Sequence, residues 1–124
     1  MTAVFYCLSQ PAGHAANEII DVISVSAVFD QKVAVAFMGD GVWQLFDNTT
    51  IATGKNTVKF LAALPTFDVD EFLVERESLY RQNLFDRFHE SRNAAKDSFL
   101  NHVKIKDRSV IRERMRAFDV IVTD

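Results

Sequence analysis

The residue in this sequence best able to do chemistry is its single cysteine. Cys7 lies in an apolar run, "AVFYCL", and His14 follows in the next segment. A thiol near a histidine can act as a nucleophile, but reactivity requires exposure and an electropositive setting that lowers the pKa of the thiol. A free cysteine in an apolar run is usually a small buried hydrophobic residue. We therefore expect Cys7 to belong to the core, and a catalytic thiol is the alternative.

A second candidate is the segment "FMGDGVWQLF", residues 37–46, in which an aspartate stands between two glycines. Glycine and aspartate favour tight turns, so Asp40 and its neighbours are expected to set the geometry of a turn that contacts another subunit. Trp43, the only tryptophan, and Phe46 follow. Because aromatic side chains are enriched at the buried centres of interfaces, these two residues are expected to pack either against the end of a sheet or against a neighbouring subunit.

Other types of site have less support in the sequence. The "GDG" segment lacks the G-x-G-x-x-G pattern of a dinucleotide loop, and no segment has the Lys-Ser/Thr ending of a phosphate-binding loop. The three histidines, His14, His89 and His102, lack the short spacing at which metal ligands converge. The residues "CLSQ" (7–10) also replace the acidic pair that a Mg²⁺-binding receiver domain needs. We therefore predict no cofactor and no metal.

The composition is that of an ordinary globular protein. The chain has 124 residues, of which 48% are hydrophobic and 25% charged, and this length predicts a single domain over residues 1–124. No apolar stretch is long enough to span a bilayer, and the start of the sequence does not resemble a signal peptide. A single cysteine cannot form an internal disulfide. The expected location is therefore the cytoplasm, without membrane association.

Charge is unevenly distributed along the chain. Residues 1–75 carry 3 basic and 9 acidic side chains, whereas residues 76–116 carry 11 basic and 6 acidic ones. The basic residues alternate with acidic ones along expected helices, a pattern typical of a solvated surface. A nucleic-acid site on this chain alone is not predicted, because a compact basic stripe with interleaved aromatic residues is missing.

The elements that position these residues are predicted to be alternating strands and helices. Five apolar runs predict strands, at 3–8, 32–38, 71–75, 102–107 and 118–122. The run at 102–107 alternates with lysines and predicts a half-exposed strand near the sheet edge, whereas 118–122 predicts a buried strand. This alternation implies a three-layer α/β/α sandwich with a mostly parallel five-stranded sheet, of the flavodoxin-like type. The functional loops would then follow the carboxyl ends of the strands.

Helical spacing connects these strands. The segment between the first two strands has apolar residues one turn apart (Ile19, Ile20, Ile23, Ala27) and is long enough for a crossover. Further helices are expected at 56–64, ended by Pro65, at 78–91, and from a cap at Asp107 or Ser109 to Arg116. The residues "VWQLF" could form one helical turn.

Several blocks together resemble the DsrE/DsrF/DsrH family of small sulfur-relay proteins, most closely its DsrF or TusC branch. The blocks are "MGDGVWQLF", "FDVDEFLV" leading into "ESLYRQ", and the tail "VIRERMRAFDVIVTD". The resemblance implies a parallel five-stranded sheet and the transfer of sulfane sulfur as a cysteine persulfide. It also implies a hetero-oligomer with DsrE/TusD-like and DsrH/TusB-like subunits. Such complexes serve either 2-thiolation of the tRNA wobble uridine or sulfur oxidation. The resemblance therefore implies that this chain would interact with tRNA only indirectly.

The resemblance also bears on catalysis. In the DsrE or TusD branch the persulfide cysteine lies at the end of the third strand, which here reads "LVERES" and places Glu75 at or next to that position. A carboxylate cannot carry sulfane sulfur, so the resemblance implies a non-catalytic subunit. Two alternatives remain: a sulfurtransferase that uses Cys7 as the persulfide carrier, or a homo-oligomeric binding module. The stretch 85–101 is longer than expected for the family and is predicted to be helical.

Overall fold

Five strands and four α-helices make up most of the computed structural model, which describes residues 2–11, 14–29, 32–46, 61–67, 69, 71–94 and 99–124. The strands are β1 (Ala3–Leu8), β2 (Lys32–Phe37), β3 (Glu71–Glu75), β4 (Val103–Lys106) and β5 (Val120–Thr123). The helices are α1 (His14–Val28), α3 (Arg76–Arg81), α4 (Phe85–Ala94) and α5 (Arg108–Met115). Three 3₁₀ segments are η1 (Gly39–Leu45), η2 (Leu64–Phe67) and η3 (Phe99–His102).

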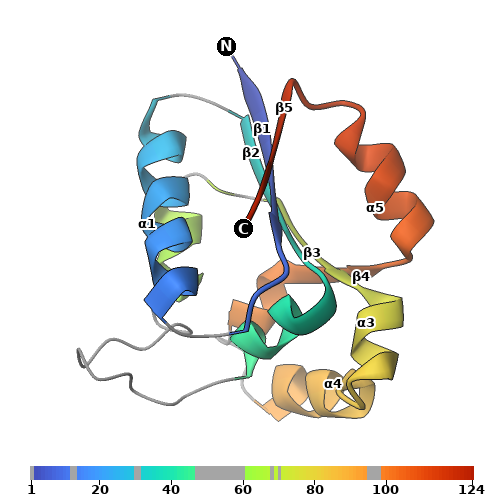
Figure 1. Cartoon of the computed structure of the whole chain (residues 1–124). Coiled ribbons are helices and arrows are strands. Elements are labelled where there is room, and N and C mark those ends of the chain that lie inside the picture. Colours follow the sequence, from blue (N-terminus) through green and yellow to red (C-terminus); the bar gives the residue numbers. More distant parts are fainter. Residues whose placement is uncertain are drawn as a thin grey trace.

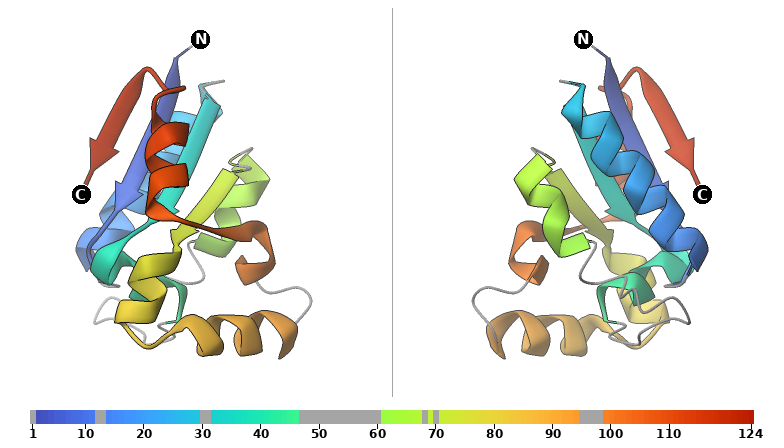
Figure 2. Two further views of the ribbon diagram at one scale, coloured as in Figure 1. Left: turned by 90° about the vertical axis from the view of Figure 1, so that its right-hand side faces the viewer. Right: turned by 90° about the vertical axis from the view of Figure 1, so that its left-hand side faces the viewer.

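The strands form one parallel sheet in the order β4-β3-β2-β1-β5. Helix α1 covers one face of the sheet and α5 covers the other (Figure 1). The residues from 61 to 67 lie beside α1 on the same face, and η1, α3 and α4 gather at the carboxyl ends of the strands (Figure 2). The predicted α/β sandwich with a parallel five-stranded sheet is therefore confirmed. The α1 crossover between β1 and β2 is confirmed as well.

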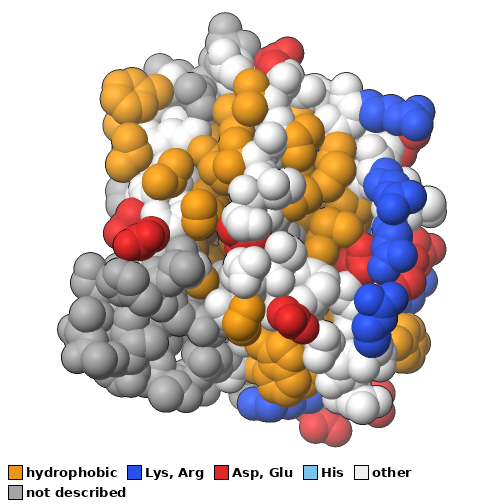
Figure 3. Space-filling model, in the orientation of Figure 1, with side chains coloured by type: hydrophobic (Ala, Val, Ile, Leu, Met, Phe, Trp, Pro, Cys, Tyr) orange, Lys and Arg blue, Asp and Glu red, His pale blue; other side chains and the backbone are white. Residues whose placement is uncertain are grey.

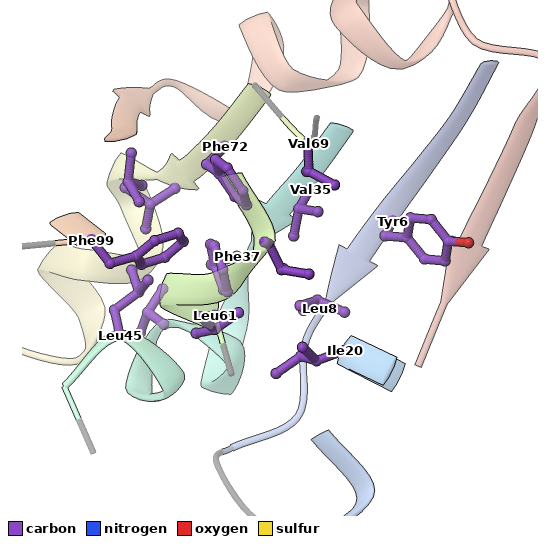
Figure 4. Close-up of a cluster of buried hydrophobic side chains, with 14 of the residues drawn as sticks. Tyr6, Leu8, Ile20, Val35, Phe37, Leu45, Leu61, Val69, Phe72 and Phe99 are labelled. Carbon is purple, nitrogen blue, oxygen red and sulfur yellow. The ribbon is translucent and has the colours of Figure 1, made fainter. Parts of the chain in front are cut away.

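The two faces of the sheet are filled differently. The α1 face carries the larger core, in which Phe37, Phe72 and Phe99 pack edge to face, while Leu8 and Val35 extend it (Figure 4). The α5 face carries a smaller core with alanines on β2. Its buried members are Phe5, Cys7, Ala34, Ala36, Leu73, Ile111 and Phe118. Side chains alternate between faces along a strand, so β1, β2 and β3 each contribute to both cores.

The last strand differs from the prediction. The sequence predicts a buried strand at 118–122, but β5 pairs only with β1 and forms an edge of the sheet. Val120 and Ile121 are each 43% exposed. A run of β-branched residues indicates a strand but does not tell an edge from a centre, because the sheet order is decided by long-range pairing. Phe118, just before the strand, is buried as predicted.

The helix predicted at 78–91 is instead two helices with a sharp turn between them. Helix α3 ends at Arg81 with Gln82 as its C-cap, and Asn83 adopts a left-handed conformation with φ of 57°. The amide of Leu84 donates to the carbonyl of Leu79 at 2.8 Å, and that of Asn83 to Tyr80 at 3.1 Å. This bonding pattern is a Schellman motif, in which asparagine is a favoured left-handed residue. The helix predicted within 85–101 is confirmed as α4, while residues 95–98 lie outside the described part.

Two other helix boundaries need adjustment. The helix predicted at 56–64 begins outside the described residues, and the helical residues 61–63 continue as η2 beyond Pro65. Helix α5 begins after Asp107, as predicted, but the Asp107 side chain pairs with Arg76 at 2.9 Å and makes no cap. The carboxylate of Glu77 accepts the first helical amide, Arg108 N, at 3.0 and 3.1 Å. A side chain from α3 therefore caps α5.

Candidate functional site

An ion pair between a buried carboxylate and a partly exposed guanidinium lies at the carboxyl end of β3. Glu75 is 1% exposed. Arg108, at the start of α5, binds it with two hydrogen bonds, from Nε to Oε2 at 3.0 Å and from Nη2 to Oε1 at 2.9 Å. Ser78 Oγ donates a third hydrogen bond to Oε1 at 2.6 Å. The carboxylate is thereby held in one orientation by two different helices.

The environment of Glu75 keeps the carboxylate ionised. Burial by itself would raise the pKa of Glu75, but the hydrogen bonds from Arg108 and Ser78 and the charges of Arg108 and Arg81 together hold that pKa below its ordinary value. At neutral pH this carboxylate has no proton to donate, and its three hydrogen bonds occupy both oxygen atoms. Glu75 is therefore suited to holding α3 and α5 together.

The "GDG" segment connects to this ion pair through its backbone. The amide of Gly39 donates to Ser78 Oγ at 2.8 Å, so the hydroxyl group bridges η1 and Glu75. Gly39 has a positive φ of 55°, a conformation that glycine adopts most easily. Gly41 packs so closely on the end of β1 that a Cβ atom there would lie 1.8 Å from the carbonyl oxygen of Leu8. Glycine is therefore required at position 39 for its backbone conformation and at position 41 because a side chain has no space.

Asp40 and Trp43 hold the end of α3. Gln82 Nε2 donates to Asp40 Oδ1 at 2.9 Å, and Trp43 Nε1 donates to Gln82 Oε1 at 3.1 Å. Asp40 is exposed, and Trp43 remains 36% exposed. Both residues are therefore accessible from solvent while being fixed in orientation by one glutamine.

Phe46 lies apart from this exposed pair. Its ring is buried and packs edge to face on Phe88, with the ring centroids 6.3 Å apart, and the guanidinium of Arg87 lies 5.1 Å from its centroid. The sequence left open whether the aromatic residues pack against their own chain or against a neighbouring subunit, and Phe46 packs against its own chain. Substitution of Phe46 would therefore disturb the core before any contact with a partner.

Sequence reasoning missed three residues of this site: Ser78, Gln82 and Arg108. Arg108 lies 33 positions from Glu75 in the chain, and nothing in the local pattern links them. Ser78 follows Glu75 by three residues at the start of a helix, a spacing that could have suggested a hydrogen bond. The side chain of His14, a possible neighbour of Cys7, lies outside the described residues.

Cys7 lies on the α5 face of the sheet and is 7% exposed. Burial, followed by the negative charges of Asp124 and Glu75, raises the pKa of Cys7 to about 11. Both effects disfavour the thiolate, which is the nucleophilic form. The surroundings of this thiol are thus apolar and acidic, the opposite of the electropositive setting that a reactive cysteine needs.

Cys7 is expected to react with iodoacetamide at pH 7.5 at least about 100-fold more slowly than a free cysteine. A pKa near 11, against about 8.5 for a free thiol, lowers the thiolate fraction by that order, and burial slows access further. The rate is measured by mass spectrometry of the intact folded chain. Complete unfolding in urea should restore the ordinary rate, and fast labelling of the folded chain would contradict this account.

Within the described residues no group of three or more His, Cys, Asp or Glu side chains could hold a metal ion. His89 contacts the ring of Phe85, with centroids 4.8 Å apart, and His102 lies 6.3 Å from Phe99. None of the described helices has the length and apolar character needed to cross a membrane.

The fold of this chain resembles that of a protein whose structure has been solved. The crystal structure of the YchN protein from E. coli superposes with a TM-score of 0.67, covering 100% of this chain and 99% of that one, at 12% identity. This likeness shows the fold. The chain belongs to the DsrE/DsrF-like family, whose model matches residues 1–123.

Two relatives give a closer comparison. Protein TusC of Buchnera aphidicola is 30% identical over 108 residues, which cover 86% of this chain and 83% of that protein. The TusC homolog of Pseudomonas aeruginosa is 27% identical over 114 residues, which cover 90% and 87%. The family predicted from the sequence, including its TusC branch, is confirmed. The same matches support the interpretation of the chain as a sulfur-relay subunit that resembles TusC.

Proposed function

We propose that this chain is a non-catalytic subunit of a sulfur-relay complex, in which a partner carries the persulfide. The observation that supports this most directly is Glu75. The position at which the resemblance places the sulfur-bearing cysteine of catalytic relatives holds a buried carboxylate, bonded to Arg108 and Ser78. The one thiol of the chain, Cys7, is buried elsewhere with a raised pKa. Neither group is suited to accept sulfane sulfur.

The surface of the chain fits a role as a subunit. Exposed apolar side chains lie on α1 and just after it (Val22, Val25, Val28, Phe29) and on β5 (Val120, Ile121). Hydrophobic groups gather over α1 and on both sides of β5 (Figure 3). Exposed apolar area of this kind is typical of interaction sites.

The expected partners are a DsrE/TusD-like and a DsrH/TusB-like subunit. The product would be 2-thiouridine in tRNA or, on the other branch of the family, oxidised sulfur. Because a single cysteine cannot form an internal disulfide, the chain suits a reducing compartment, for which we propose the cytoplasm. Residues 1–124 would act as one domain within this complex.

The function is tested with a persulfide donor and the complex with a DsrE/TusD-like partner. We expect sulfur transfer to proceed equally well with the wild-type chain and with Cys7→Ala, and no persulfide adduct of about 32 Da on this chain. Mass spectrometry measures the adduct. A stable adduct on Cys7, lost in Cys7→Ala together with transfer, would make this chain a sulfurtransferase. Assembly with copies of itself alone would favour a homo-oligomeric module.

Trp43→Ala is expected to weaken assembly with the catalytic partner by about 2 kcal/mol or more, as for a hot-spot residue. The support is geometric, since Trp43 is partly exposed beside Asp40 and is held by Gln82. Tyr80→Ala is a matched control, because Tyr80 is a more exposed aromatic residue of α3. The dissociation constant is measured by titration. Equal affinities of wild-type and Trp43→Ala chains, both folded, would remove Trp43 from the interface.

A further inference from the structure

A basic hollow lies between α5 and the edge of the sheet formed by β3 and β4. Its volume is about 590 Å³, and it is separate from the Glu75 ion pair. Four cationic side chains line it (Lys32, Lys104, Lys106, Arg114), while Glu71 is its one acidic residue. Helix α5 lies on this face of the sheet, and the hollow lies beside it, where Lys104 and Lys106 of β4 are exposed (Figure 2).

The pairing of the strands explains why the two lysines of β4 share this face. Lys32 lies towards the other end of the hollow, since the β2 residue level with Lys104 is Ala36, four residues further along. Lys104 pairs with Leu73, which belongs to the core beneath α5, so Lys104 points to the α5 face. Lys106 lies two residues further along the same strand, and thus about 7 Å away on the same face. Lys32 approaches from the start of β2, with Nζ 5.6 Å from the ring of Phe118. Both lysines of β4 are exposed.

The acidic residue of the hollow does not offset these lysines. Arg114 binds Glu71 through two hydrogen bonds, from Nε to Oε1 at 2.6 Å and from Nη2 to Oε2 at 2.8 Å. This pair neutralises itself. Among the described residues Lys104 and Lys106 form no salt bridge, so the hollow keeps an excess of positive charge.

We propose that this hollow binds a small organic phosphate, a molecule that joins phosphate groups to a compact body. Lysine ammonium groups bind phosphate as point charges, and two or three of them match the charge of a diphosphate. Leu73 lies in the wall of the hollow beside Val110, which is 46% exposed and offers apolar contact to the body of the ligand. The volume lies within the range of about 300–1,000 Å³ that is typical of small-molecule sites. This inference is independent of the proposed function.

The test titrates the full chain with adenosine diphosphate, pyrophosphate and adenosine, followed by NMR. We expect saturable binding of the diphosphate, weaker binding of pyrophosphate, and no binding of adenosine. Shifts in the amide signals should centre on Leu73, Lys104 and Val110. The double variant K104Q/K106Q should weaken diphosphate binding about tenfold or more, and K104R/K106R should retain it.

The matched control is R112Q/R116Q, which removes one positive charge from α5 and one from the residue that follows it, both outside the hollow. Its affinity for the diphosphate should stay within about twofold of wild type. An equal loss in both double variants would mean diffuse attraction to a basic surface and would overturn the proposal. Absence of saturable binding would also overturn it. The lysines of β4 would then serve only to prevent another chain from pairing with the edge of the sheet. Displacement of the diphosphate by a glutamate-rich peptide of equal charge at lower concentration would assign the hollow to an acidic protein segment instead.

Discussion

Gly41→Ala is expected to lower the free energy of unfolding by about 3 kcal/mol or more, because the new methyl group has no room. The added Cβ atom would lie 1.8 Å from the carbonyl oxygen of Leu8 and 2.6 Å from its carbonyl carbon. That carbonyl group cannot easily move, since it accepts a hydrogen bond from Met38 N at 3.0 Å where β1 and β2 end. Relief of the clash would therefore separate η1 from the sheet. Urea unfolding at pH 7 measures the loss.

Gly39→Ala is the matched control within the same segment. Nothing lies within 4 Å of a Cβ atom at Gly39, so its only cost is the positive φ of 55°, about 1 kcal/mol for alanine. The two variants have the same change in composition. Gly39→Ala adds backbone strain without a clash, whereas Gly41→Ala adds the clash. Equal stability of Gly39→Ala and Gly41→Ala would show that η1 does not pack on the end of β1 as described.

The predictability of the fold depended on how local each signal is. Apolar runs such as "KVAVAF" indicate buried strands by themselves, and helical spacing in "EIIDVISVSAV" identified α1. The exposure of β5 is not a local property, since it follows from the order in which strands pair. The break between α3 and α4 was readable in principle, because Asn83 is a residue type that favours the left-handed end of a helix.

The candidate site was predicted only in part. The sequence placed Glu75 at the end of a strand and Asp40 in a turn. The family resemblance added that Glu75 lies at or next to the position of the persulfide cysteine in catalytic relatives. The guanidinium that neutralises Glu75 could not be found, because Arg108 reaches it from another helix after a long separation in the chain. Charge pairing between distant segments leaves no periodic trace in a sequence. The basic hollow was missed for the same reason, as its lysines come from β2 and β4.

Glu75 and Arg108 form a clamp that holds α3 and α5 together, and the stability that this clamp contributes depends on pH. The pKa of Glu75 is held below its usual value in the folded chain. In the unfolded chain a glutamate titrates near pH 4.3. A group with a lowered pKa in the folded state contributes stability that is present above the unfolded pKa and is lost as the pH falls through the folded pKa. The clamp is therefore complete at pH 7 and is released in acid.

Glu75→Ala is accordingly expected to cost about 3 kcal/mol at pH 7, because it leaves the buried Ser78 hydroxyl and the Arg108 guanidinium without their partner. At pH 3, below the pKa of an unfolded glutamate, the cost should be smaller than at pH 7, since the wild-type chain is then losing the charge-dependent part of the same interaction. Glu113→Ala is the control: Glu113 pairs with Arg116 on the exposed side of α5, and its loss should stay within about 0.5 kcal/mol.

Two further variants separate charge from shape at this position. Glu75→Gln keeps the volume and part of the hydrogen bonding, so its cost at pH 7 should be smaller than that of Glu75→Ala. Arg108→Ala leaves the buried carboxylate without its counter-charge, so burial should then raise the pKa of Glu75 and lower the stability at neutral pH more than Arg112→Ala does. Urea unfolding at pH 7 and pH 3 measures all of these. If Glu75→Ala costs the same at both pH values, the ion pair does not contribute through its charge, and the site holds α3 and α5 by packing alone.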